Sequence, residues 1–80
     1  MMWVYVCRLC NREFMDVVDL LAHMELEHMG DERVREVVRT WRDVWAAGYR
    51  LSRKERYDDL RERGLADRRW VRRGVFSKFP

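Results

Sequence analysis

The chain has 80 residues, with 17 Lys and Arg, 14 Asp and Glu, two cysteines and two histidines. This length predicts one small domain, or a small module fused to an extension. No apolar run is long enough for a transmembrane helix, and residues 1–6 lack the basic start and apolar core of a signal peptide.

Charge is divided unevenly along the chain. Residues 1–47 carry six basic and nine acidic side chains, a net charge of −3, whereas residues 48–80 carry eleven basic and five acidic, a net charge of +6. This asymmetry predicts an anionic partner for the C-terminal region. The cations are 15 Arg and two Lys. Arginine suits bidentate pairing with phosphate or carboxylate, although GC-rich coding or a hot habitat would also produce this bias.

Both cysteines and both histidines fall in one short pattern, Cys7-x2-Cys10-x12-His23-x4-His28. Two thiols and two helix-spaced imidazoles match the number and type of ligands that tetrahedral Zn²⁺ prefers. We therefore predict one Zn²⁺ bound by Cys7, Cys10, His23 and His28. Because its cysteines would serve a metal, we expect an intracellular protein, in the cytoplasm of a prokaryotic host or in a eukaryotic nucleus.

Two other interpretations of these ligands are weaker. A redox pair or disulfide at Cys7 and Cys10 lacks the βαβ pattern that accompanies thioredoxin-like sites. A catalytic zinc would keep one position open for water, and the segment from His23 to His28 lacks the His-Glu-x-x-His spacing of metalloproteases. We expect a structural zinc and no enzymatic activity.

Apolar residues stand at fixed offsets from the ligands. Tyr5 lies two residues before Cys7, Phe14 lies four after Cys10, and Leu20 lies three before His23. With the ligands, these positions resemble the C2H2 zinc-finger family over residues 5–28. The resemblance implies a ββα finger, and small single-finger proteins of this kind are similar to those of archaea and their viruses.

The expected fold class is small α+β, with a ββα zinc finger over 1–30 and a helical extension over 31–80 packed on it as one unit. In the finger, residues 3–6 favour a strand, Asp16 can cap a helix and Gly30 can end it. The extension should have two to three helices. The first spans 31–47, and the second starts at the capping box of Ser52 and ends at Gly64.

The finger helix is a poor candidate for reading bases. In the C2H2 family, bases are contacted from four positions that correspond here to Asp16, Val18, Asp19 and Ala22. Two carboxylates would face a polyanion, and the two apolar side chains make no bidentate bond to a base edge. Family fingers also usually work in tandem, whereas this chain has one.

Two apolar stripes lie at helical spacing. One, on the finger helix, consists of Val17, Val18, Leu21 and Met24. We expect the extension to cover it; the alternative is a protein partner or self-association. The other stripe, on the helix over 31–47, includes Trp41 and Trp45, which we expect to pack in the core against the finger.

The basic C-terminal region contains the candidate nucleic-acid contacts, which are Arg68, Arg69, Arg72, Arg73 and Lys78. Its arginines could grip phosphates while Trp70 anchors or stacks; alternatively Trp70 turns into the core and the arginines pair with carboxylates of the preceding helix. Residues 57–73 loosely resemble a helix-turn-helix.

The expected function is a zinc-stabilised nucleic-acid-binding protein, a small DNA-binding transcriptional regulator whose partner is duplex DNA. The alternative is a protein-interaction module that uses the apolar stripe of the finger helix. RNA as the target stays open.

Overall fold

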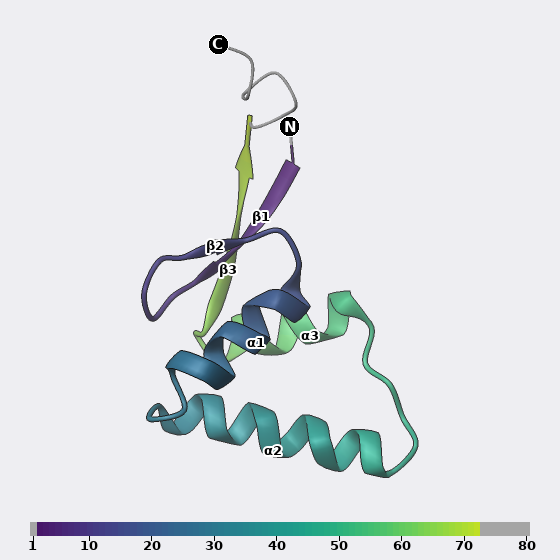
Figure 1. Cartoon of the computed structure of the whole chain (residues 1–80). Helices are drawn as coiled ribbons and strands as arrows, with labels where there is room; N and C mark the ends of the chain where they lie inside the picture. Colours follow the sequence, from purple (N-terminus) through teal and green to yellow (C-terminus); the bar gives the residue numbers. More distant parts are fainter. Residues whose placement is uncertain (1, 73–80) are drawn as a thin grey trace.

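The computed structural model describes residues 2–72, so Arg73 and Lys78 lie outside the described residues. Its elements in chain order are β1 (Met2–Cys7), β2 (Glu13–Phe14), α1 (Val17–Glu27), α2 (Glu32–Ala46), α3 (Arg53–Glu62) and β3 (Ala66–Val71) (Figure 1). The predicted small α+β class is confirmed, and its first three elements are compatible with a ββα finger. None of the helices in this part of the chain is long and apolar enough to cross a membrane.

The helices begin where the sequence places their caps. Asp16 accepts a hydrogen bond from the backbone of Val18 at 3.0 Å. Asp31 caps α2 in the same way, and Ser52 forms the predicted capping box with Glu55. Each cap satisfies a backbone donor that the first helical turn leaves unpaired.

The helix ends follow the sequence less closely. Gly48 and Gly64 follow α2 and α3 with φ of 90° and 75°, a left-handed conformation that glycine adopts without steric cost. By contrast α1 already ends at Glu27, before the predicted stop at Gly30.

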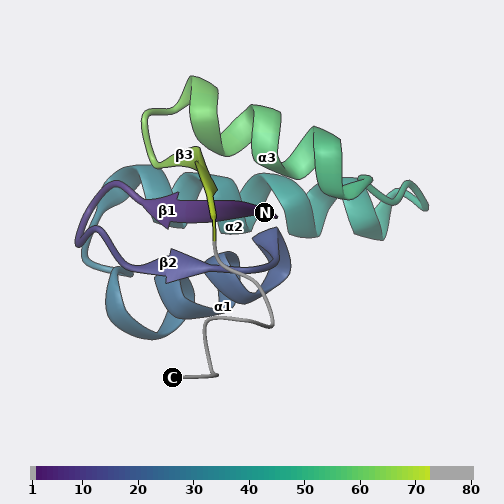
Figure 2. The same cartoon turned by 90° about the horizontal axis from the view of Figure 1, so that it is seen from above.

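The three strands form one antiparallel sheet in the order β2-β1-β3. Tyr5 pairs with Phe14 on one side and with Arg68 on the other, so these three side chains point to the same face. The helices pack against this face. Viewed from above, α1 lies on the β2 side of the sheet and α3 on the β3 side (Figure 2).

The core lies between the sheet and the three helices. Its fully buried side chains include Leu20 and Met24 from α1, Val34 and Val37 from α2, and Leu60 from α3. The helices of the extension therefore pack on α1.

This packing divides the apolar stripe of α1. Val17 and Met24 are buried, Leu21 is half-buried against the core, and Val18 remains 42% exposed. Most of the stripe is thus covered within the chain.

The loose helix-turn-helix resemblance over residues 57–73 is wrong. Residues 66–71 form β3, which pairs with β1 along its whole length from Met2↔Val71 to Cys7↔Ala66. The second edge of β1 needs a hydrogen-bonding partner, and a strand is the element that satisfies it. The local sequence, which is rich in arginine, gives no sign of this pairing with a strand far away in the sequence. Over residues 31–72 the extension is therefore two helices and a strand.

The expectation that both tryptophans of α2 lie in the core is only half right. Trp41 is partly buried and packs against the core, whereas Trp45 is 65% exposed. With 15 residues α2 is longer than α1 with 11. The two helices run antiparallel, and the last turns of α2 continue past the N-terminal start of α1 (Figure 1). The final turn therefore has no helix above it to bury Trp45.

One shared core predicts one cooperative unit. Leu60 is fully buried, so we expect Leu60→Ala to lower the free energy of unfolding by about 2–5 kcal/mol. Met15, which is 69% exposed, provides the control, and Met15→Ala should change the free energy of unfolding by less than about 0.5 kcal/mol. Urea denaturation followed by circular dichroism measures both. Separate transitions for sheet and helices would contradict the shared core.

Candidate metal centre

The two cysteines are positioned by the end of β1 and the turn that follows it. Cys7 is the last residue of the strand, and its backbone N–H donates to Arg12 O at 2.8 Å. Asn11 donates to Cys7 O at 2.7 Å and has a φ of 66°, a left-handed conformation that asparagine tolerates better than most residues. This tight turn brings Cys10 back over the end of the strand.

The two histidines come from the C-terminal half of α1. His23 lies within the helix, and His28 is its C-cap, with its N–H donating to Met24 O at 2.8 Å. The five-residue separation exceeds one helical turn, so the chain must change direction for both rings to meet. It does so at His28, whose φ of −127° is no longer helical.

The four predicted ligands lie together. One donor atom from each of Cys7, Cys10, His23 and His28 lies within 4.8 Å of all the others. His23 Nε2 is 3.2 Å from Cys10 Sγ and 3.1 Å from His28 Nε2. Bonds of about 2.0–2.3 Å to a tetrahedral ion place donor atoms roughly 3.3–3.8 Å apart. The group can therefore hold one metal ion with small adjustments.

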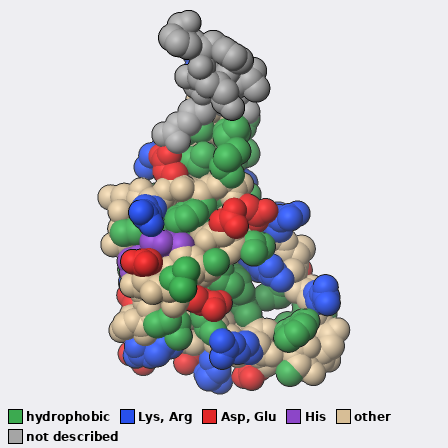
Figure 3. Space-filling view, viewed as in Figure 1, with side chains coloured by type: hydrophobic (Ala, Val, Ile, Leu, Met, Phe, Trp, Pro, Cys, Tyr) green, Lys and Arg blue, Asp and Glu red, His purple; other side chains and the backbone are tan. Residues whose placement is uncertain are grey.

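Burial differs across the site. Cys7 is fully buried in the core, His23 is nearly so, and Cys10 is exposed. The ring of Phe14 lies 4.9 Å from that of His23, so the sheet supports the ligand-bearing face of α1. Histidine side chains reach the surface at one side of the molecule (Figure 3). An ion could thus enter from solvent while the core fixes the inner ligands.

The electrostatics of the site favour a cation. Burial raises the pKa of the Cys7 thiol above its ordinary value, because a thiolate there is poorly solvated. A bound cation would reverse this effect, since coordinated thiols lose their protons. Burial also lowers the pKa of His23, and the neighbouring His28 lowers it further. A neutral imidazole is the form that binds metal.

Two further charged residues line the hollow beside the ligands, which has a volume of about 320 Å³. Glu27 lies on the metal side of α1, as its helical spacing from His23 indicates, but its carboxylate is not among the four clustered donors. Arg12 was not predicted, because the sequence pattern gives no sign that its side chain returns to the metal side. Its positive charge also contributes to the lowered pKa of His23.

Of the predicted phosphate-contacting arginines, the three that the structure describes are not among the clustered metal donors. Arg68 and Arg69 are on β3 and Arg72 follows it. The guanidinium of Arg68 lies 4.4 Å from the centroid of the Trp3 ring. Arg69 forms an ion pair with Glu13 at 2.6 Å that crosses from β3 to β2.

The finger-helix positions that correspond to base-reading residues are partly engaged in the fold. Asp16 caps α1 and forms an ion pair with Arg53 of α3 at 3.1 Å. Val18 and Asp19 are exposed beside it, so the start of α1 keeps a carboxylate at its surface.

Comparison with known proteins identifies no relative of this chain. The chain matches no family model, no curated protein and no solved structure. The candidate metal centre therefore depends on the identity of its four donors and on their convergence in the structure.

Metal binding should depend on all four donors and not on the adjacent carboxylate. We expect one Co²⁺ per chain with the absorption bands of tetrahedral S₂N₂ coordination. Cys10→Ser removes a direct ligand. Loss of a residue that only hydrogen-bonds to a ligand weakens metal binding by up to about 100-fold, so we expect a larger effect here. Absorption titrations measure both.

The matched control is Glu27→Gln, which removes a nearby charge but no clustered donor. It should keep the stoichiometry and the tetrahedral spectrum. Loss of the spectrum in Glu27→Gln together with retention in Cys10→Ser would refute the ligand assignment.

Proposed function

We propose that this protein is a zinc-stabilised nucleic-acid-binding protein, a small regulator that contacts duplex DNA through the strands β1 and β3. The observation that carries the proposal is the association of exposed tryptophans with an arginine on this pair of strands. Trp3 and Trp70 are 44% and 50% exposed, and Arg68 lies over the Trp3 ring.

Zn²⁺ suits the metal centre because two thiolates and two imidazoles form a soft tetrahedral donor set. Four protein ligands leave no position for a reactive water, so the proposed role is structural. A ββα unit of about 30 residues buries too little surface to fold unaided. Zinc binding, with an apparent free energy of about 10–16 kcal/mol in zinc-finger peptides, would offset that deficit.

The outer half of the β1–β3 pair forms a ribbon, defined here as Met2–Tyr5 with Arg68–Val71. It continues beyond the helices (Figure 1), and hydrophobic side chains gather on it in the space-filling view (Figure 3). The rings of Trp3 and Trp70, which are paired across the strands, meet edge to face at 5.0 Å. A two-stranded ribbon of this kind fits the major groove, which is about 12 Å wide.

Cations surround the base of the ribbon. Arg8, from the turn after β1, lines a hollow of about 250 Å³ together with Arg68 and Arg69, against one carboxylate, that of Asp67. The backbone N–H of Arg8 donates to Leu65 O at 3.0 Å, which fixes this turn against the start of β3. Arg8 was not predicted as a contact, because only the pairing of β1 with β3 brings it to the arginines of residues 68–72. Guanidinium groups so placed suit phosphate binding.

Binding should be electrostatic and localised to the ribbon. In gel shifts with a random-sequence duplex, log K should fall linearly with log salt, at about −0.9 per phosphate contact. The double change Arg68→Gln with Arg72→Gln should weaken binding and reduce the slope by about 2. Trp70→Ala should also weaken binding, because the proposed contact includes this exposed ring.

The control is Arg39→Gln with Arg61→Gln, which removes the same charge from α2 and α3. It should leave affinity and slope nearly unchanged, with thermal melting confirming that all variants fold. Equal losses in the two double variants would contradict a localised site. Tighter binding to single-stranded DNA would refute a duplex-binding regulator but would keep a nucleic-acid-binding ribbon.

A further inference from the structure

A groove lies between α1, the C-terminal half of α2 and the connection from α2 to α3. It encloses about 210 Å³. Its floor is aliphatic and includes Leu21, Val38 and Leu51, which are buried or half-buried. Beside the floor stand Trp45 and Tyr49, which are 65% and 53% exposed. We call this feature the aromatic groove. An apolar hollow of this size suits one or two bulky side chains better than a whole small molecule.

Hydrogen bonds to carboxylates of α3 hold two rings of the aromatic groove in place. Trp41 Nε1 donates to Asp59 Oδ2 at 2.6 Å, and the Tyr49 hydroxyl donates to Glu55 Oε2 at 2.9 Å. Hydrogen bonds from the Ser52 backbone and from Tyr49 lower the pKa of Glu55, so this acceptor stays ionised. Rings fixed in this way lose little freedom when a ligand binds.

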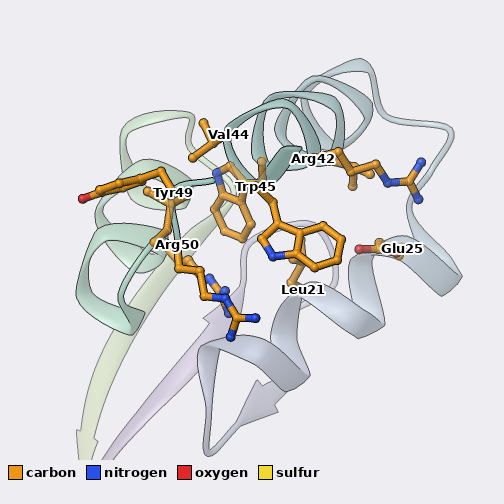
Figure 4. Close-up of a pocket in the computed structure, with 11 residues that line it drawn as sticks. Leu21, Glu25, Arg42, Val44, Trp45, Tyr49 and Arg50 are labelled. Carbon is orange, nitrogen blue, oxygen red and sulfur yellow. The ribbon is translucent and has the colours of Figure 1, made fainter. Parts of the chain in front are cut away.

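The rim of the aromatic groove is basic. Arg42, Arg50 and Arg56 line it, against one carboxylate, that of Glu25. Arg56 lies 5.9 Å from the centroid of the Trp41 ring. Among residues 2–72, Arg42 and Arg50 have no ion-pair partner. Figure 4 shows Glu25 and Arg42 at one side of Trp45 and Arg50 at the other. The rim therefore suits an acidic segment.

An acidic, apolar segment with the complementary properties lies on the same chain. Leu26 is 83% exposed at the end of α1, and Met29 beside it is 40% exposed. Successive helical residues are about 100° apart, so Glu25 and Glu27 flank Leu26 on its two sides. We call residues 25–27 the acidic knob.

We propose that the acidic knob of a second copy of this chain occupies the aromatic groove. Leu26 would enter the hollow, and its flanking carboxylates would face Arg42 and Arg50. Because Glu25 lines the groove and Leu26 follows it directly, knob and groove lie side by side on one chain. Two copies related by a two-fold axis can therefore exchange knobs reciprocally, which gives a closed dimer.

The chemistry of the groove favours this occupant over nucleic acid. A base inserted between Leu21 and Val38 would bury polar edges without hydrogen-bond partners, whereas a leucine has none to satisfy. A dimer would carry two basic ribbons, but its existence does not depend on the proposed nucleic-acid function.

Sedimentation of the full-length, zinc-loaded chain without nucleic acid tests the dimer. Concentrations from about 1 µM to about 0.2 mM cover weak homodimers. We expect a monomer–dimer equilibrium that Trp45→Ala and Leu26→Asp each weaken at least about tenfold. Both residues are exposed, so circular dichroism and the cobalt spectrum should stay unchanged in the variants.

Mixing the two variants gives the sharper result. The Leu26→Asp chain keeps an intact groove and the Trp45→Ala chain keeps an intact knob, so the mixture should form a heterodimer with one complete contact. The control Met15→Asp, at a residue 69% exposed outside the groove and the knob, should dimerise like the unmodified chain. A monomer at all concentrations would overturn the proposal. So would a dimer that neither variant weakens, or a mixture that forms no heterodimer.

Discussion

The position of Cys7 joins the core of this protein to its candidate metal centre. Its side chain is fully buried, it pairs with Ala66 of β3, and its sulfur belongs to the four-donor cluster. A thiolate buried in the core is poorly solvated, so ionisation of Cys7 is unfavourable and its pKa is raised. A bound cation would remove the cost and draw β1, the turn after it and α1 together. We expect the order of the sheet to depend on this one ion.

From this junction the fold places its surfaces on opposite sides of the core. The sheet continues past the helices as a ribbon with arginine and tryptophan side chains, whereas the helices carry the aromatic groove and the acidic knob. The helices α2 and α3 thus do more than cover α1. They fix β3 against β1 through Leu65, which is fully buried, and they hold the rings of Trp41 and Tyr49 through carboxylates of α3. In the proposed function, the metal forms a platform and the strand at its edge meets the nucleic acid.

Local signals predicted the parts of this protein that local chemistry determines. The four ligands and the helix starts at Asp16, Asp31 and Ser52 were readable, because spacing and capping act within a few residues. The strand over residues 66–71 was missed because its partner lies about 60 residues away, and the free edge of β1 decides its conformation. The exposure of Trp45 was missed for a related reason. Helical periodicity gives the direction of a side chain but not the length of the neighbouring helix that would cover it.

The central claim is that one zinc ion with two sulfur and two nitrogen ligands holds the sheet to α1. X-ray absorption at the zinc edge of the purified full-length chain tests it most directly. If the four clustered donors hold zinc as proposed, we expect one zinc per chain, with two Zn–S distances of about 2.3 Å and two Zn–N distances of about 2.0–2.1 Å. An oxygen ligand in place of a sulfur or nitrogen, or a folded chain that retains no metal, would contradict the account.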